Sequence, residues 1–340
     1  MSFLALLATS LLEIPAAKPA ARPIAFLAAK ALTCERTGPG YVDHALVLVR
    51  DGKIEKVLPA RDAAIPPEYE LVDLGSRWIM PGMIDLHSHL LPGVDDGSKS
   101  VEQSVAVLHR LAAQGLTDLA LTPHLLASQA AQGAPPLHDR AFAALTAAAP
   151  DTVRLHRGAE VMLDRPLDPV IASDRRVTLN GSRYILVEFP RMVAAQTVEH
   201  ALALVVAVGL VPVLAHPERY KCCRIDLARR WKSLGSLLQV DGPTLLSNRP
   251  RGDRARELVA EGLADIAAGD NHGDDRSLRG AWDEFVAHEG RLQAELLLER
   301  NPRAILEDRP TEPVPPLTWR FSLVDRVRAL FGTGQGEDRP

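Results

Sequence analysis

The sequence predicts an α/β protein in which a seven-stranded, TIM-like (β/α)7 barrel follows a small N-terminal segment of β-sandwich type. From residue 83 onward, short apolar runs alternate with longer stretches of helical periodicity, which indicates parallel strands joined by crossover helices. Seven such runs fit a closed barrel, and no glycine-rich dinucleotide fingerprint follows the first of them. Residues 22–82, by contrast, are β-rich in pattern.

The composition is that of an ordinary globular enzyme. The chain has 340 residues, 46% of them hydrophobic, enough for one large domain with a smaller appended one. A net charge of -4 gives no reason to expect nucleic-acid binding. No run approaches the roughly 20 apolar residues that span a bilayer. Cys34, Cys222 and Cys223 form no CxxC pair, which argues against a thiolate metal site.

The first 21 residues are a possible signal or disordered segment. Residues 3–12 form an apolar run of signal-peptide length and small residues follow it, but no Lys or Arg precedes it. We therefore expect a cytoplasmic protein, with export through this weak signal as the alternative.

Residues 22–82 are expected to form a separate β segment. Residues 45–57 contain two apolar runs joined by Asp51 and Gly52, a pair that favours the two-residue turn of a hairpin. Residues 71–82 follow as another strand that ends in a turn. The segment, with DGKI leading to PGMIDLHSH, resembles the small β-sandwich that precedes the barrel in the amidohydrolase superfamily.

The barrel is expected to span residues 83–308. Its strands are predicted at residues 83–86, 117–121, 153–156, 184–187, 211–215, 236–240 and 264–268. Its clearest helices are predicted at residues 101–114, 198–208, 253–261 and 281–299. Residues 309–340 are expected to be a proline-rich linker and a peripheral tail.

Six of the seven predicted strands carry a metal-binding side chain at or just after their carboxyl ends. The first leads into His87 and His89, and residues i and i+2 of a strand point the same way, so both imidazoles can reach one ion. Asp95 and Asp96 follow in the adjoining loop. The other strands lead into His124, Glu160, Glu188, His216, Asp270 and His272. Barrels of this kind build their active sites on that face. We interpret the six remaining histidines as structural or solvated.

The candidate ligands offer only nitrogen and oxygen donors. They are His87, His89, Asp96, His124, Glu160, Glu188, His216, Asp270 and His272. Such donors suit manganese, iron or zinc in an open catalytic site. Nine ligands are too many for one ion, so we expect two or three ions that share a bridging carboxylate. Three divalent ions would bring six positive charges against four carboxylates, which favours a bound hydroxide and an anionic substrate such as a phosphate.

The short motifs around these ligands occur in a characteristic order: HxH followed by DDG, then TPH, RGxE, EFP, AHPERY and DxH. In this order they resemble the PHP (polymerase and histidinol phosphatase) superfamily. Over residues 83–305 the resemblance is to its branch of manganese-dependent protein-tyrosine phosphatases of capsule biosynthesis. It implies a phosphotyrosine protein or another phosphomonoester as substrate. It also implies three divalent ions per chain, manganese first, with iron or zinc as alternatives.

The resemblance implies how the ligands are shared among the ions. His87, His89, Glu160 and Asp270 would hold one ion, Glu160 would bridge to a second held by Glu188 and His216, and Asp96, His124 and His272 would hold the third. Arg219 and Arg276 resemble that branch's phosphate-binding arginines, a role that suits planar guanidinium groups. For Arg219 the alternative is a surface salt bridge with Glu218.

Three features depart from the family pattern. Leu125 stands where a second histidine is usual, and Asp241 stands where asparagine is common. Arg276 lies in a loop that is one residue shorter than usual. These departures bear on the substrate more than on the metal ligands.

Three functions are therefore open. The first is a metal-dependent phosphoesterase, in particular a protein-tyrosine phosphatase. The second is an amidohydrolase acting on a C–N bond. Resemblance to that superfamily implies a site with one or two metal ions and often a carboxylated lysine at the end of the fourth strand. This chain has Glu188 there, and His272 would be a surplus ligand. The third is a binding module without activity, which is disfavoured because no metal ligand is missing.

Overall fold

The computed structural model describes residues 22–33, 41–79, 81–130, 132–167 and 173–319. The chain divides into two compact units, of which the first ends at Pro81 and the second begins at Gly82. The predicted signal or disordered segment and the tail beyond residue 319 lie outside the described residues. Within the described ranges, no helix is both long and apolar enough to cross a membrane.

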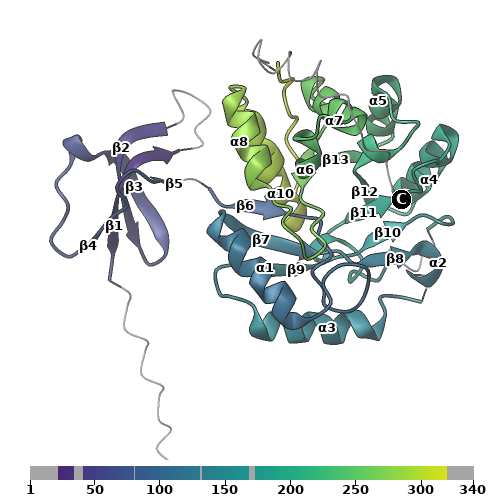
Figure 1. The fold of residues 1–340 in the computed structure, drawn as a ribbon, viewed down its shortest axis with the longest axis horizontal. Coiled ribbons are helices and arrows are strands. Elements are labelled where there is room, and N and C mark those ends of the chain that lie inside the picture. Colours follow the sequence, from purple (N-terminus) through teal and green to yellow (C-terminus); the bar gives the residue numbers. More distant parts are fainter. Residues whose placement is uncertain (1–21, 34–40, 80, 131, 168–172, 320–340) are drawn as a thin grey trace, which may run out of the picture. The chain divides into compact units, whose positions relative to one another are not determined.

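The N-terminal unit is a five-stranded sheet in the order β3-β2-β1-β4, with β5 also paired to β1 (Figure 1). Its strands are β1 (Ile24–Leu32), β2 (Tyr41–Arg50), β3 (Lys53–Pro59), β4 (Glu70–Asp73) and β5 (Trp78–Ile79). The predicted hairpin is β2–β3: Asp51 and Gly52 both have positive φ, 52° and 72°, as its two-residue turn requires.

Both faces of this sheet are covered. Leu46 packs on one face with Tyr69, and Val47 packs on the other face in a second cluster. The sequence pattern predicts no separate strand at the position of the central strand β1. Its buried residues, Ala25, Ala28 and Ala31, recur every third position, which imitates a helix rather than a strand.

The second unit is built on parallel strands. They are β6 (Met83–Asp85), β7 (Leu116–Leu121), β8 (His124–Leu126), β9 (Arg154–Arg157), β10 (Glu160–Met162), β11 (Tyr184–Glu188), β12 (Val211–Ala215), β13 (Leu237–Asp241) and β14 (Ile266–Ala268). They form one sheet in the order β6-β7-β9 and another in the order β14-β13-β12-β11-β10-β8. Each of the seven predicted strands has a counterpart here.

The two sheets continue one another around a ring. Only Thr122 and Pro123 separate β7 from β8, and only two residues separate β9 from β10. On the opposite side the backbone of Asp270 donates to the carbonyl of His87 at 2.9 Å, and His89 donates to Asn271 at 2.8 Å. These contacts link the two sheets at both edges, and the carboxyl ends of the strands lie together on one side.

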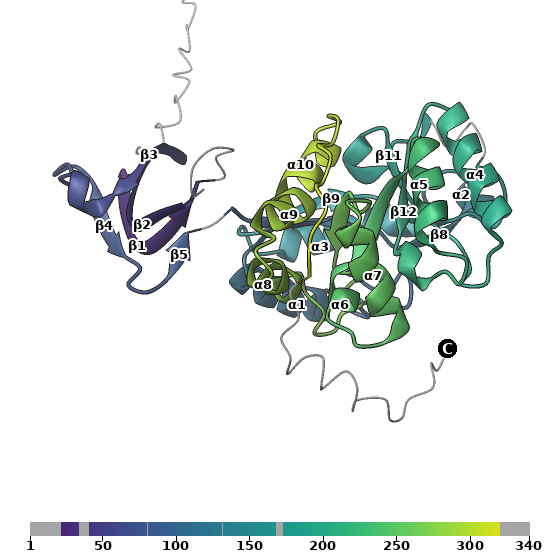
Figure 2. The same ribbon diagram turned by 90° about the horizontal axis from the view of Figure 1, so that it is seen from above.

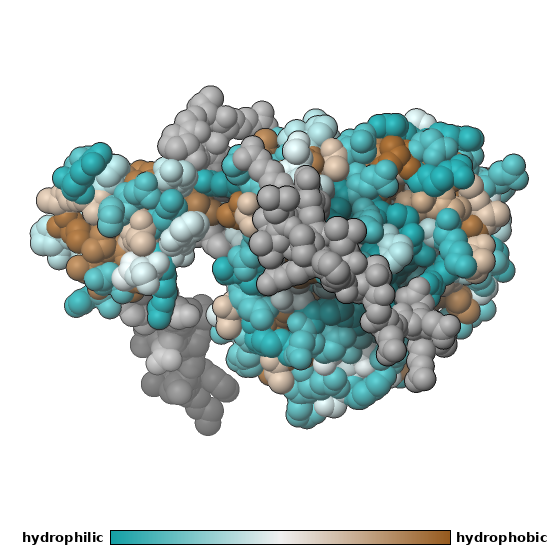
Figure 3. All heavy atoms as spheres, turned by 45° about the horizontal axis from the view of Figure 1, so that its top comes forward, coloured by the Kyte–Doolittle hydropathy of each residue, from teal (hydrophilic) through white to brown (hydrophobic). Residues whose placement is uncertain are grey.

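Helices cover the outside of these strands (Figures 1 and 2). The longer ones are α1 (Val101–Ala113), α3 (Pro136–Ala148), α4 (Ala195–Ala207), α5 (Ile225–Ser233) and α7 (Pro250–Ala260). The short helical turns of this unit are α2 (Ala127–Ala130), η3 (Leu179–Gly181), η4 (Pro217–Arg219) and α6 (Gly242–Leu245), while η1 (Ala60–Asp62) belongs to the N-terminal unit. Buried side chains from several strands, among them Ile84, Leu186 and Val213, form the core. The face of this unit seen in Figure 3 is largely hydrophilic.

The single helix predicted at residues 281–299 is wrong. The segment contains α8 (Arg279–Ala287), α9 (Arg291–Glu295) and a π-helical turn η5 (Leu296–Arg300), followed by α10 (Asn301–Leu306). α8 ends because Glu289 takes a left-handed φ of 60° and Gly290 donates its N–H to the carbonyl of Phe285 at 2.7 Å. A Cβ at Gly290 would lie 2.7 Å from Leu317, so glycine fits this break.

The described part of the proline-rich linker packs on the second unit. Val314 and Leu317 are each only 5% exposed. Asn301 accepts a hydrogen bond from the backbone of Glu312 at 2.7 Å and donates to its carbonyl at 2.9 Å. Residues 309–319 therefore form a docked strap rather than a free linker.

Candidate metal centre

His87 and His89 lie side by side at the mouth of the strands. Their Nε2 atoms are 3.2 Å apart, and both side chains are fully buried. Asp270 Oδ1 lies 3.3 Å from each of these nitrogens. Glu160 Oε2 lies 3.2 Å from His87 Nε2 and 3.3 Å from His89 Nε2. The structure therefore brings together the four residues expected to share one ion.

The other ring nitrogens of these two histidines are held by neighbours. His87 Nδ1 lies 3.0 Å from Gln239 Oε1, and because an amide oxygen only accepts, Nδ1 carries the proton. His89 Nδ1 lies 2.7 Å from Asp95 Oδ2, which also accepts the backbone N–H of His124. Both contacts leave Nε2 with its lone pair facing the centre, which is how outer partners orient metal-binding histidines.

Neither of these two positioning residues is predicted from the sequence pattern. The pattern places Asp95 in a loop without assigning it a role, and it does not distinguish Gln239. A signal for Gln239 existed, since it stands two residues before Asp241 on the same strand and therefore points to the same side.

A second set of donors surrounds Glu160. Its Oε1 lies 2.9 Å from His216 Nε2, and its Oε2 lies 3.0 Å from His124 Nδ1. Glu188 Oε1 approaches the same His124 nitrogen at 3.1 Å. The strand register explains this proximity, because Glu160 is paired with His124 on one side, and Met162, two residues further along β10, is paired with Glu188 on the other.

A third set opens towards solvent. Asp96 Oδ1 lies 3.5 Å from Nε2 of both His124 and His272, and the Asp96 side chain is 68% exposed. His124 stands between two sets, with Nδ1 facing the glutamates and Nε2 facing Asp96. A neutral imidazole offers a single lone pair, so His124 can serve only one of them at a time.

Four groups of donor atoms could each hold an ion, with all atoms of a group within 4.8 Å of one another. They are His89, Asp96, His124 and His272; His87, Glu160 and His216; His87, His89 and Asp270; and His124, Glu160 and Glu188. Among the described residues, these groups contain the nine predicted ligands and no others.

The charges of this centre fit divalent cations. Burial alone would raise the pKa of Glu160, but the surrounding imidazoles hold it well below its usual value. The pKa of Asp270 is likewise held well below its usual value against burial, by His87, His89 and Arg219. Burial would lower the pKa of His89, yet Asp270, Asp95 and Glu160 raise it well above normal. The ionised carboxylates favour positive charge on the buried imidazoles. A bound metal ion would supply that positive charge in place of the protons.

The two predicted arginines approach the far side of Asp270. Arg219 Nη2 lies 2.5 Å from Asp270 Oδ2, and Arg276 Nη1 lies 3.4 Å from the same oxygen. Arg219 Nη2 also lies 2.5 Å from Asp241 Oδ2. The alternative partner, Glu218, is fully buried and instead accepts the backbone N–H of Asp241 at 2.9 Å, while burial raises the pKa of Glu218 to about 8.

Comparison with known proteins places this arrangement in a family. Residues 83–307 match the family described as capsular polysaccharide synthesis, CpsB/CapC. The chain belongs to the CpsB/CapC family. It is 27% identical over 241 residues to the tyrosine-protein phosphatase CpsB of Streptococcus pneumoniae, a match covering 67% of this chain and 99% of that protein.

Solved structures of other proteins are similar to this chain in fold. A crystal structure from work on YwqE of Bacillus subtilis and CpsB of Streptococcus pneumoniae, described as unique metal-dependent tyrosine phosphatases, matches with a TM-score of 0.56. That match has 22% identity and covers 70% of this chain and 100% of the other. A dihydropyrimidinase from Brevibacillus agri matches with a TM-score of 0.54 and 11% identity, covering 86% of this chain and 84% of the other. The predicted resemblance to the phosphatase branch is thus confirmed, and the likeness to amidohydrolases holds at the level of the fold.

Two of the candidate ligands of this CpsB/CapC protein have strained backbones. His216 and Asp270 have φ values of 32° and 45°, in the left-handed region that side-chain-bearing residues rarely adopt. Such strain costs on the order of 1–3 kcal/mol and persists only where neighbouring contacts hold it. At Asp270 the backbone bond to His87 is such a contact. Strained conformations of this kind occur at functional sites, although other described residues such as Asn180 and Asp308 also have positive φ.

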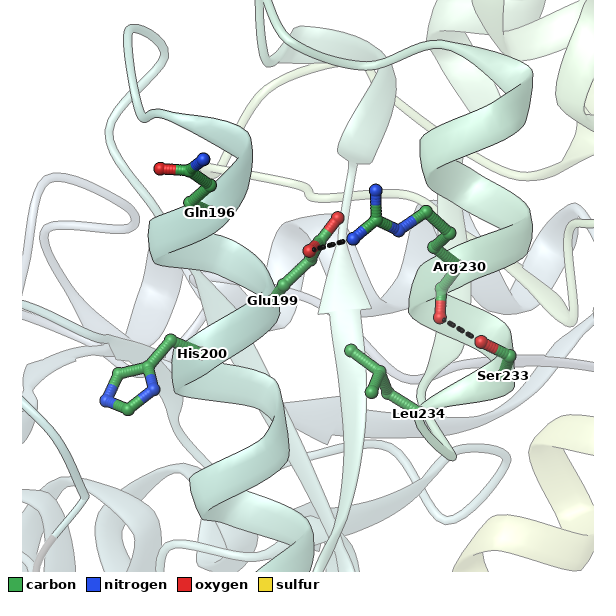
Figure 4. Close-up of a pocket in the computed structure, with 6 residues that line it drawn as sticks. All are labelled: Gln196, Glu199, His200, Arg230, Ser233 and Leu234. Carbon is green, nitrogen blue, oxygen red and sulfur yellow. Dashed lines mark hydrogen bonds and ion pairs between the residues drawn. The ribbon is translucent and has the colours of Figure 1, made fainter.

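One cavity of the CpsB/CapC unit lies apart from this centre. It has a volume of about 340 Å³ and lies between α4 and α5, lined by Gln196, Glu199, His200, Arg230, Ser233 and Leu234 (Figure 4). Arg230 donates to Glu199 across it at 2.6 Å. It contains none of the candidate ligands.

Proposed function

We propose that this chain is a metal-dependent protein-tyrosine phosphatase that hydrolyses the phosphomonoester of phosphotyrosine. The observation that carries the proposal is the convergence of nine nitrogen- and oxygen-bearing ligands beside two arginines at one end of the strands. The family membership and the phosphatase names of the related proteins support it.

We infer a centre of three ions, most simply manganese, at the mouth of a seven-stranded (β/α)7 barrel. His87, His89, Glu160 and Asp270 would hold one ion, Glu160 would be shared with a second ion held by Glu188 and His216, and Asp96, His124 and His272 would hold the third. This division assigns the single lone pair of His124 to one ion, and each of its donors belongs to at least one of the four groups. When bound, the ions supply an activated water at neutral pH and neutralise phosphate charge.

The chain's own residues would bind and orient the substrate. Arg219 and Arg276 present guanidinium groups that suit two phosphate oxygens each and would stabilise the charge that develops in the transition state. Asp270 faces the metal ligands with Oδ1 and the arginines with Oδ2. It would therefore fix the position of the arginines relative to the metal ligands. The phenolate of tyrosine is a good leaving group, so no strong general acid is needed.

The test is phosphate release from p-nitrophenyl phosphate and from phosphotyrosine peptides, with manganese, iron or zinc added to chelator-treated protein. We expect metal-dependent release that falls by at least about a hundredfold in the variant Arg219→Ala. The exposed Arg229→Ala on α5 is the matched control and should retain activity. Absence of phosphate release with every metal, together with hydrolysis of a cyclic amide, would instead favour the amidohydrolase function.

A further inference from the structure

Asp241 ends strand β13 with its side chain inside the centre. It is only 3% exposed, and its carboxylate makes three polar contacts with two residues. Its Oδ2 lies 2.5 Å from Arg219 Nη2 and accepts the hydroxyl of Thr244 at 2.8 Å, and its Oδ1 caps the backbone N–H of Thr244 at 3.4 Å. None of these contacts belongs to the candidate metal ligands.

Arg219 is held through a single nitrogen of its guanidinium group, Nη2. The same Nη2 bonds to Asp241 and to Asp270, each at 2.5 Å. Its Nε is buried and has no hydrogen-bond partner among the described residues. The guanidinium is thus anchored by a single nitrogen, while other N–H groups remain for a ligand. An anion with several oxygens suits such a fork.

Asp241 also changes the charge around this arginine. Asp241 and Asp270 together bring two negative charges against Arg219, and Arg276 adds a second positive charge beside Asp270. The Glu218 side chain accepts a hydrogen bond from the backbone N–H of Asp241, and Arg254 donates to the backbone carbonyl of Glu218. An asparagine at position 241 would keep an oxygen acceptor for Arg219 and remove one negative charge.

We propose that Asp241 is a positioning residue that holds Arg219 against Asp270 and that its charge weakens the binding of phosphate, which favours product release. The proposal rests on the proposed function, in which Arg219 binds the phosphate group. It separates two effects of one side chain. The hydrogen bond orients the arginine, and the negative charge repels the product.

Two substitutions separate these effects. Asp241→Asn keeps an acceptor and a residue type that caps helices well, so α6 should still form. Asp241→Ala removes both the acceptor and the charge. Asp226→Asn, an exposed position on α5 with a 65% exposed side chain, makes the same change of charge away from the centre and is the control.

The measurements are binding of inorganic phosphate to the manganese-loaded protein by isothermal titration calorimetry, metal content, and kcat and KM for p-nitrophenyl phosphate. For Asp241→Asn we expect about tenfold tighter phosphate binding and a lower KM, with unchanged metal content. For Asp241→Ala we expect kcat/KM to fall about tenfold or more, because Arg219 loses its anchor. Asp226→Asn should behave like the wild type.

The proposal is overturned if Asp241→Asn binds phosphate as the wild type does, or more weakly, or if it loses metal. Calorimetry needs no turnover, so this outcome is distinct from failure of the proposed function, which would appear as an inactive wild type. If Asp241→Ala does not fold, Thr244→Val removes the hydroxyl that orients Asp241 and should raise KM without tightening phosphate binding. An unchanged KM in that variant would contradict the positioning role.

Discussion

His87 and His89 face one another through their Nε2 atoms at 3.2 Å, while their Nδ1 atoms face an amide and a carboxylate respectively. Two N–H groups cannot point at each other at this distance, so at least one Nε2 presents a lone pair. The pair is therefore arranged to share a cation. Gln239 then orients the ligand His87, and Asp95 orients the ligand His89.

Replacing Gln239 by leucine should weaken metal binding. The change leaves the Nδ1–H of buried His87 without a partner and frees the ring to change tautomer. We expect manganese affinity to fall about 10- to 100-fold, measured by competition with a metal-sensitive dye. Gln196→Leu, at an exposed position on α4, is the control. Equal affinities in the two variants would show that Gln239 does not orient His87.

Asp95→Asn should weaken metal binding by a different route. The Asp95 carboxylate contacts His89 Nδ1 at 2.7 Å and makes that imidazole a more basic ligand. The neutral amide keeps the shape but loses the charge, so we expect about a tenfold loss of manganese affinity with the fold intact. Asp275→Asn, whose side chain is 100% exposed, should have no effect. Undiminished affinity in Asp95→Asn would refute the role.

Gly97→Ala should displace the loop that carries the ligand Asp96. A Cβ at position 97 would lie 1.9 Å from the carbonyl oxygen of His89 and 2.5 Å from its Cβ, so the backbone must shift. We expect a loss of about 1–3 kcal/mol in the free energy of unfolding, measured in urea, and a lower metal content. A variant with wild-type stability and metal content would show that the loop tolerates this contact.

Asp118 should contribute stability that is lost in acid. Burial alone would raise its pKa, but hydrogen bonds from His156 and Arg154 hold it well below its usual value. Because the pKa of Asp118 is lower in the folded state than the value of about 3.9 in the unfolded state, its carboxylate stabilises the protein fully when the pH is above the unfolded-state pKa. This stabilisation is lost progressively as the pH falls through the folded-state pKa. Asp118→Asn should therefore cost about 2 kcal/mol at pH 7, with the deficit shrinking from about pH 5 downward. Urea unfolding at several pH values measures this, and a deficit independent of pH would contradict it.

The sequence contained most of the site because its ligands stand at strand ends. Once the strands at Tyr184, Val211 and Ile266 were recognised by their apolar runs, Glu188, His216 and Asp270 had to meet at one mouth. All nine predicted ligands lie within the four donor groups. Periodicity in the chain and the topology of parallel strands were sufficient for this much.

The rest depended on contacts between residues distant in sequence. Gln239 reaches His87 across 152 positions, and no local pattern signals such a pair. The break between α8 and α9 depends on the left-handed conformation of Glu289 and on the absence of a side chain at Gly290 beside Leu317, which the helical spacing of the apolar residues conceals. The alanines of β1 likewise imitate a helix until a neighbouring strand pairs with them.

Metal stoichiometry measured together with activity tests the central claim most directly. Chelator-treated protein is titrated with manganese, and bound metal per chain is determined by mass spectrometry alongside hydrolysis of a phosphotyrosine peptide. We predict that activity rises as metal binds and reaches its plateau at three ions per chain. Full activity with a single ion, or three bound ions without phosphate release, would contradict the account.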